Sequence, residues 1–253
     1  MIPIDLIHDI LLRLPAKSAA RFRCVSKLWL SITTRQDFIS SFTSRHSSTR
    51  LCLLLCVEKG EKRLFNSIPQ LEHPDKTFNP YVERYEISAP KFVYYEGSEQ
   101  SVHGLICLRD FDGNIVVWNP TTRQHVYLPK PQPNFIAVVS SFLGYDPVEH
   151  KYKVLCIPVC SRYQDLLVFT LGPQESWRVP QNSLYHESTS TSGIKGICIN
   201  GHVYYEASIR FIVDGAFKTE AIVMSFDVRY EKFNVIKKPV DDELGNLFIN
   251  YKG

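Results

Sequence analysis

Apolar residues near the start of the chain recur at the helical period. Leu6, Ile7, Ile10, Leu11 and Leu14 form one broad stripe, spaced as on one side of a helix. The proline at position 3 suits a first helical turn, and the proline at position 15 stops the helix. The pattern predicts an amphipathic helix over about residues 3–14.

Weaker helical patterns continue into the low forties. A second short helix is predicted over residues 18–25, and Ser26 can cap a third. The apolar positions of these segments are Ala19, Phe22, Val25, Leu28, Trp29, Ile32, Phe38, Ile39 and Phe42. So short a module has more apolar residues than a core of its own can take, so we expect a partner protein to cover them. The alternative is an ordinary N-terminal helix packed on its own domain.

The pattern changes after residue 45. Residues 43–49 are small and polar and read as a linker. Short β-branched and aromatic runs then alternate with turn residues, which is typical of all-β structure. The strands predicted are residues 50–57, 62–66, 104–109, 114–118, 125–128, 137–145, 151–157, 165–171, 177–179, 196–199, 202–207, 220–227, 232–236 and 247–251.

The strand pattern repeats. Series begin near residues 104, 142, 196 and 245, a period of about 40–55 residues with about four strands each, the size of a propeller blade. The predicted fold class is α+β multidomain: a small all-α, three-helix module over residues 1–45, then an all-β, propeller-like domain over residues 46–253. A β-sandwich is the alternative. The last series stops inside a blade, so we expect an incomplete ring, an exposed sheet edge and marginal solubility.

The helical segment also carries a dense residue pattern. It reads Ile2-Pro3-Ile4-Asp5-Leu6, Ile10-Leu11, Arg13-Leu14-Pro15, Arg21-Phe22-Arg23-Cys24-Val25-Ser26-Lys27 and Trp29. Over these positions the sequence resembles the F-box, departing only where isoleucine replaces the usual leucine at position 2. The resemblance implies docking onto a Skp-type adaptor protein and, through it, onto a cullin-RING ubiquitin ligase. By motif position, the residues implied to bind the adaptor are Pro3, Leu6, Ile7, Ile10, Leu11, Leu14, Pro15, Val25 and Trp29.

The remainder of the chain resembles the F-box-associated domain of large plant F-box families. The residues that carry this resemblance are Gly104-Leu-Ile-Cys-Leu108, Val117-Trp-Asn-Pro-Thr-Thr-Arg-Gln124, Leu128-Pro129, Leu143-Gly-Tyr-Asp-Pro147, Tyr152-Lys-Val154 and Ser176-Trp-Arg178. The resemblance implies that loops at one end of the β domain recognise a protein substrate. Residues 69–86 and 181–193 are the long polar segments that fit this role, with tyrosines at positions 81, 85 and 185.

Several of these motifs have a structural interpretation that we prefer. Asn119 before Pro120 is expected to bond to its own turn amides, and Asp146 before Pro147 is expected to do the same. Trp118 and Trp177 are expected to pack inside the blades.

The composition limits the class of protein and the cellular location that we expect. The chain has 253 residues, of which 44% are hydrophobic and 12% aromatic, as in a folded globular protein. No apolar run is long enough to cross a bilayer, and the first helix is too interrupted by charge for a signal peptide. The odd number of cysteines, 7, scattered among apolar residues predicts reduced thiols and a cytoplasmic and/or nuclear location.

The first fifty residues are basic. Lysines and arginines outnumber the acidic residues Asp5, Asp9 and Asp37 there, which would steer the segment toward an acidic protein surface. Nucleic acid is the rival partner, but no nucleic-acid motif accompanies these charges, so we expect neither nucleic acid nor membrane as a partner.

The sequence carries only weak signals for metal-binding or catalytic sites. Cys52 and Cys56, like Cys156 and Cys160, are spaced by four in strand-like runs, which holds the sulfurs too far apart to share a zinc ion. No His-x-x-x-His, Gly-x-Ser-x-Gly, Walker or dinucleotide motif occurs. We expect no catalysis, no metal and no cofactor.

The sequence therefore favours a substrate receptor of an SCF (Skp-cullin-F-box) ubiquitin ligase with an unknown protein target. The alternatives are an adaptor-binding regulatory or non-functional truncated F-box protein without a substrate, and a propeller that binds a small molecule or glycan.

Overall fold

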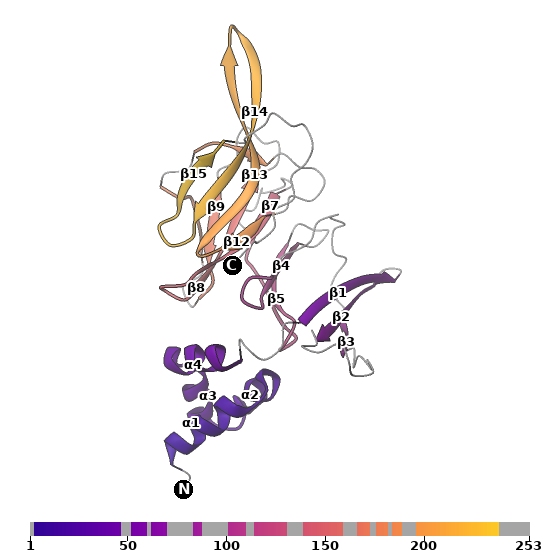
Figure 1. Cartoon of the computed structure of the whole chain (residues 1–253), viewed down its shortest axis with the longest axis vertical. Helices are drawn as coiled ribbons and strands as arrows, with labels where there is room; N and C mark the ends of the chain where they lie inside the picture. The colour runs from indigo at the N-terminus through magenta and orange to yellow at the C-terminus, as the bar shows by residue number, and fades with distance from the viewer. Residues whose placement is uncertain are drawn as a thin grey trace, which may run out of the picture. The chain divides into compact units, whose positions relative to one another are not determined.

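The architecture comes from a computed structural model of the chain. It describes residues 3–46, 52–59, 62–69, 83–87, 101–109, 114–130, 139–158, 166–172, 176–181, 184–188 and 196–237. The chain divides into two compact units, residues 1–91 and 92–253. Each is described by itself below (Figure 1).

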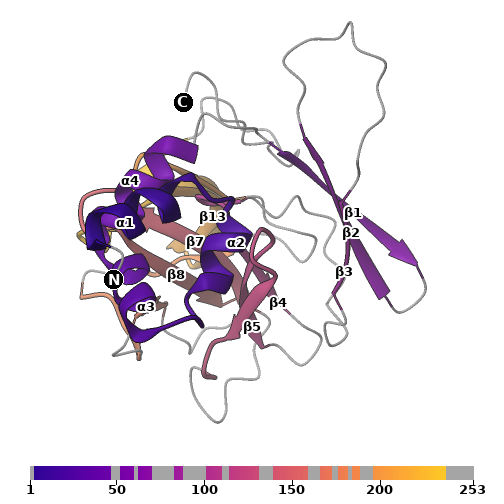
Figure 2. The same cartoon turned by 90° about the horizontal axis from the view of Figure 1, so that it is seen from below.

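Four helices open the first unit (Figure 2). They are α1 (Ile4–Arg13), α2 (Ala16–Phe22), α3 (Lys27–Thr34) and α4 (Gln36–His46). Prolines precede α1 and α2, and Ser26 caps α3, as predicted, by accepting a 3.2 Å hydrogen bond from the Trp29 amide. The second helix, predicted over residues 18–25, begins and ends earlier, at Ala16 and Phe22. The prediction of a three-helix module is corrected to four helices, because residues 36–46 turn away from α3 as a helix of their own.

The helices bury a small core. Ile7 and Leu11 of α1 pack with Ile32 of α3 and Phe38 of α4, each at most 5% exposed. The module therefore forms a core of its own, but Ile4, Leu6 and Ile10 of α1 stay exposed, so its apolar residues exceed what this core buries, as expected. The fourth helix completes this core, because Phe38 packs against α1 and its ring contacts the His8 ring edge-on, with the ring centroids 5.3 Å apart.

A three-stranded antiparallel sheet completes the described part of the first unit. Its strands, in the order β1-β2-β3, are Cys52–Lys59, Lys62–Pro69 and Glu83–Ile87. The first two agree with the sequence prediction, while β3 lies in a segment that was expected to be a loop.

Three antiparallel sheets make up the described part of the second unit. The first has the order β4-β5-β6, with strands Ile106–Arg109, Ile115–Asn119 and Gln124–Tyr127. The second has the order β10-β9-β8-β7, with β7 Val139–Asp146, β8 Lys151–Pro158, β9 Leu167–Thr170 and β10 Trp177–Arg178. The third has the path β11-β13-β14-β15, with strands Glu187–Ser188, His202–Val213, Ala216–Asp227 and Lys232–Ile236, and β12 (Ile197–Ile199) pairs with β13.

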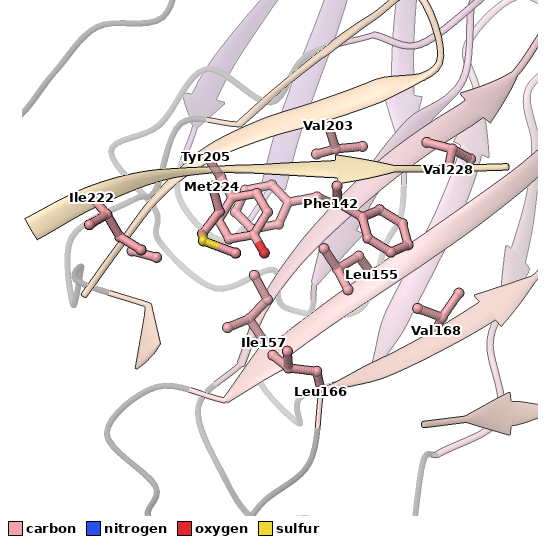
Figure 3. Packing of buried hydrophobic residues seen from close by; sticks show 12 residues of the cluster. Phe142, Leu155, Ile157, Leu166, Val168, Val203, Tyr205, Ile222, Met224 and Val228 are labelled. Atoms are coloured by element: carbon pink, nitrogen blue, oxygen red, sulfur yellow. The ribbon is translucent and has the colours of Figure 1, made fainter. Parts of the chain in front are cut away.

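These sheets stack through two apolar clusters. One lies between the second and third sheets, where Leu155 and Val168 face Tyr205 and Met224 (Figure 3). The other joins the first and second sheets through residues such as Val117 and Phe169. Gly144 on β7 permits close approach, because a Cβ there would lie 2.6 Å from a methyl group of Val228. Stacked, consecutive antiparallel sheets are the propeller-like arrangement that the repeat pattern predicts.

The long hairpin β13–β14 differs most from the prediction. Both strands extend well beyond the predicted residues 202–207 and 220–227. Asp214 and Gly215 join them with positive φ angles of 52° and 76°, as a two-residue turn of type I′ requires. The tip of this hairpin projects beyond the rest of its sheet (Figure 1). The predicted strand at 247–251 lies outside the described residues.

Candidate functional site

The first helix carries an exposed apolar row beside its buried one. Leu6 and Ile10, one turn apart, are 52% and 42% exposed, while their neighbours Ile7 and Leu11 are 5% and 0% exposed. Residues four apart lie one above the other on a helix, so each pair forms a continuous strip. The stripe predicted from the sequence is thus divided between the module's core and its surface.

Further exposed apolar side chains lie in the connection between α2 and α3 and on α3 itself. Val25, Leu28 and Leu30 are 58%, 43% and 45% exposed. The cap at Ser26 fixes the start of α3, and the Trp29 ring packs 5.1 Å from Phe22. The segment is therefore held in place while its aliphatic side chains stay open to solvent.

The predicted adaptor-binding residues fall into three classes. The exposed class contains Pro3, Leu6, Ile10, Pro15 and Val25. The partly buried class contains Leu14 and Trp29, and the buried class contains Ile7 and Leu11. Their contact with an adaptor stays a prediction. Ile7 and Leu11 face the module's own core, where their direct role is to hold the exposed row in place.

The adaptor-binding set inferred from motif position leaves out four exposed apolar side chains of the described helices, Ile4, Leu28, Leu30 and Ile39. Ile4 is 55% exposed, and Leu28 and Leu30 flank Trp29 on α3. The signal available for Leu28 and Leu30 was their position on either side of an aromatic residue that faces inward.

Charge on the helical module is uneven. Arg13 forms an ion pair with Asp9 at 3.1 Å, and Arg35 forms one with Asp37 at 2.8 Å. The hydrogen bond from Arg35 lowers the pKa of the Asp37 carboxyl. Lys17, Arg21 and Lys27 form no ion pair within the described part of the chain. The unpaired cations leave this module with an electropositive character.

The loops predicted to bind substrate are only partly described. Of residues 69–86, the structure describes Pro69 and the start of β3, so Tyr81 and most of the loop lie outside it. The segment 181–193 is not simply an open loop, because it contains β11, which pairs with β13. Of its described side chains, Tyr185 is 45% exposed and donates a hydrogen bond to Glu187 at 3.0 Å.

Two residues of that segment are buried. Glu187 is 3% exposed and pairs with Arg210 at 2.9 Å. His186 is 1% exposed, with Nδ1 2.7 Å from the Leu184 carbonyl and Nε2 2.7 Å from the Tyr205 hydroxyl. Burial lowers the pKa of His186 to about 4, so the ring is neutral at physiological pH. Through Tyr205 and Arg210, both residues attach the segment to β13.

The turn motifs have the structural role that the sequence indicated. Asn119 accepts a hydrogen bond from the Thr122 amide at 3.1 Å, and Asp146 accepts one from the Val148 amide at 2.8 Å. Trp118 is 2% exposed. The Trp177 ring packs against Phe169 at a centroid distance of 5.0 Å, with the ring planes tilted by 50°, and its Nε1 donates a hydrogen bond to the Pro129 carbonyl at 2.6 Å.

We next looked among the described residues for side-chain groups that could bind a metal ion. Within the described residues, no group of three or more His, Cys, Asp or Glu side chains could hold a metal ion. Cys24, Cys107, Cys156 and Cys198 are reduced and take part in no disulfide. Of the helices that the structure describes, none has the length and apolar character to cross a membrane.

Two family profiles match the chain. The F-box domain matches residues 1–41, and the F-box associated beta propeller domain matches residues 52–253. The chain belongs to the F-box proteins with an F-box-associated domain. The helical module is the F-box, and the stacked sheets belong to the associated β-propeller domain.

Relatives of this F-box protein come from Arabidopsis thaliana, and it is a plant F-box protein. Three have names that include "F-box protein": At4g21240 is 60% identical, At1g47790 40% and At5g18160 40%, each over 99–100% of this chain. The chain covers 60%, 62% and 62% of their respective lengths.

Proposed function

We propose that this F-box protein is the substrate-receptor subunit of an SCF ubiquitin ligase. Its F-box binds a Skp-type adaptor, and its β domain recruits a protein target. The chain itself catalyses no reaction. It raises the effective concentration of the target beside the ubiquitin-charged enzyme that the cullin-RING complex carries.

The exposed apolar row on α1 supports adaptor binding most directly. Leu6 and Ile10 stay in solvent although Ile7 and Leu11 beside them are buried. A well-ordered helix that exposes aliphatic side chains on one strip is typical of helix-in-groove recognition. Val25, Leu28 and Leu30 add apolar area, and the unpaired Lys17, Arg21 and Lys27 fit an acidic partner.

A binding titration with a purified Skp-type adaptor tests this function. The double variant Leu6→Asp, Ile10→Asp is expected to weaken binding at least about tenfold, because two charges would have to be desolvated in an apolar interface. Val148→Asp is the matched control, since Val148 is 60% exposed and lies in the β domain. Equal binding by the double variant and the wild type contradicts the proposal.

Receptor activity needs a second measurement. In a reconstituted ligase, a protein captured from plant extract by the β domain is expected to become ubiquitinated only when the F-box is intact. An adaptor-binding regulator without a target would instead bind the adaptor and produce no ubiquitinated partner. A cytoplasmic and nuclear distribution of a fluorescent fusion is the corresponding expectation in cells.

A further inference from the structure

The tight turn between β14 and β15, residues 228–231, presents an exposed tyrosine beside two cations. Tyr230 is 63% exposed. The guanidinium carbon of Arg229 lies 5.2 Å from the centroid of the Tyr230 ring, and Lys232 Nζ lies 5.8 Å from it. Cations at such distances are attracted to the electron-rich face of the ring, so the three side chains form one group on the surface of the β domain.

Hydrogen bonds hold the backbone of this turn in one conformation. Asp227 Oδ1 accepts hydrogen bonds from the amides of Arg229 and Tyr230, each at 2.9 Å. The Glu231 amide donates to the Asp227 carbonyl at 2.8 Å. The other carboxylate oxygen of Asp227 lies 3.5 Å from His202 Nε2. Because the turn is already ordered, a partner that binds it has little backbone entropy to remove.

The acidic residue inside the turn is neutralised, whereas the two exposed cations are not. Glu231 forms ion pairs with Lys153 and Arg178, and Lys153 also donates to the Arg229 carbonyl at 3.2 Å. Among the described residues, Arg229 and Lys232 take part in no ion pair. The surface of the turn is therefore electropositive, and its positive charge is available to a partner.

The exposed side chains of the turn have the chemistry that binds an acidic protein segment. Tyrosine and arginine are enriched at protein interfaces, where they combine apolar area with hydrogen-bonding groups. Cations without an acidic partner attract carboxylates and steer them toward the surface. The ring of Tyr230 can then pack against the aliphatic parts of the segment while Arg229 and Lys232 pair with its carboxylates.

Nucleic acid is the other class of polyanion that an aromatic ring beside cations suits. Binding a single strand takes a groove of cations that follows the backbone over several nucleotides. The β7–β8 turn lies next to this one, since Lys153 of β8 reaches the Arg229 carbonyl. There Lys151 forms a 2.7 Å ion pair with Glu149, so the neighbouring turn does not extend the free positive charge. A local positive charge favours a short acidic peptide segment over a nucleic-acid strand.

We propose that the β14–β15 turn binds a segment of the protein target that is rich in aspartate and glutamate, with Arg229, Tyr230 and Lys232 as the contact residues. The proposal names the substrate class of the receptor and rests on the receptor function proposed above. The contact is small, so one such segment binds weakly and reversibly.

Fluorescence anisotropy with the full chain tests the proposal. The probe is a short fluorescein-labelled peptide of alternating glutamate and aspartate around one central leucine. The double variant Arg229→Glu, Lys232→Glu is expected to raise the dissociation constant at least about tenfold. Lys130→Glu, Lys218→Glu is the matched control, because it makes the same change in net charge at two exposed positions elsewhere in the β domain, and it is expected to bind like the wild type.

The ring is tested separately from the charges. Tyr230→Ala is expected to weaken binding about threefold to tenfold, whereas Tyr230→Phe keeps the ring and is expected to stay within about twofold of the wild type. The charge-reversed double variant should also gain affinity for the lysine and arginine counterpart of the probe. Added salt is expected to weaken binding of the acidic probe to the wild type.

The outcomes separate this proposal from the receptor function on which it rests. All these variants are expected to bind the Skp-type adaptor like the wild type, so a failure of adaptor binding by the wild type would contradict the receptor function instead. A wild type without affinity for the acidic probe, equal binding by the double variant and its control, or tighter binding of a single-stranded oligouridylate than of the peptide would each overturn the proposal.

Discussion

In the F-box helices, Ile7, Leu11, Ile32 and Phe38 are buried, while aliphatic side chains such as Leu6, Ile10 and Val25 lie in solvent. In the β domain, two clusters bury apolar residues from all three sheets. The β domain therefore buries most of its described apolar side chains in its own clusters, whereas the F-box leaves a larger share of its apolar side chains exposed. The F-box and the β domain should therefore respond differently to the same kinds of substitution.

The largest effect is expected in the core of the β domain. Phe169 is fully buried against Trp177 and Val117, so Phe169→Ala should lower the free energy of unfolding by about 3–5 kcal/mol. Urea unfolding followed through the fluorescence of buried Trp118 measures this. Hydrogen exchange in α1–α4 should not change, and equal loss of protection there would show that the two units do not have separate cores.

Protonation of a buried histidine should have the next largest effect. The pKa of His186 is about 4 in the folded chain and 6.5 in an ordinary setting, so the unfolded chain binds the extra proton first. Stability should therefore fall as the pH drops from 6.5 toward 4, by up to about 3 kcal/mol. His186→Gln keeps a polar partner for Tyr205 but does not titrate, so it should flatten this part of the unfolding profile. An unchanged slope would assign the pH dependence to other groups.

An ion network beside the β14–β15 turn gives a smaller effect. Lys153 and Arg178 both bind Glu231, and the side chains of Lys153 and Glu231 are 9% and 16% exposed. Burial by itself raises the pKa of Glu231, but the hydrogen bonds from Arg178 and Lys153 outweigh it and lower the pKa below 4.5. Stability from this group is present above pH 4.5 and is lost as the pH falls through the lowered value.

Glu231→Gln tests that network. It leaves Lys153 buried without its counter-charge and should lower the free energy of unfolding by about 2–3 kcal/mol, with Arg178 contributing little because it is 40% exposed. The exposed pair Glu149–Lys151 is the matched control, and Glu149→Gln should give no measurable change in the same urea titration. Equal effects of the two substitutions would contradict the role of burial.

A helix cap in the F-box should matter less. Ser26→Ala removes the acceptor for the Trp29 amide and should destabilise the helical module by about 1 kcal/mol. Circular dichroism during thermal unfolding of the full chain, compared with Ser31→Ala in the same helix, measures it. A similar loss in both variants would mean that the cap is not responsible.

The smallest effect on stability is expected at the exposed row. Leu6→Ala should change the free energy of unfolding by less than about 0.5 kcal/mol, because Leu6 is 52% exposed. Leu11→Ala, one row inward, should lower it by about 2–4 kcal/mol. If Leu6→Ala destabilised the chain as much as Leu11→Ala, the division between core and binding surface would not hold.

Local signals made the bounds of α1 and the start of α3 predictable from the sequence, whereas α2 was predicted two to three residues too late. Pro3, Pro15 and Ser26 act on the backbone next to them, and the helices begin and end accordingly. The split of the α1 stripe into exposed and buried rows was not predictable, because it depends on Phe38, which is distant in sequence. The role of β11 was missed for the same reason, since a two-residue strand is set by its pairing with β13. The Asp214-Gly215 turn was a readable hairpin signal that would have extended β13 and β14.

Each sheet of the second unit is built largely from strands that follow one another along the chain. The order β10-β9-β8-β7 is the clearest case, because every pairing there joins a strand to its immediate successor. Such contacts close only short loops, which favours rapid folding. During synthesis on the ribosome, β7 to β10 can therefore assemble as soon as they emerge, before β13 and β14 have left the ribosome.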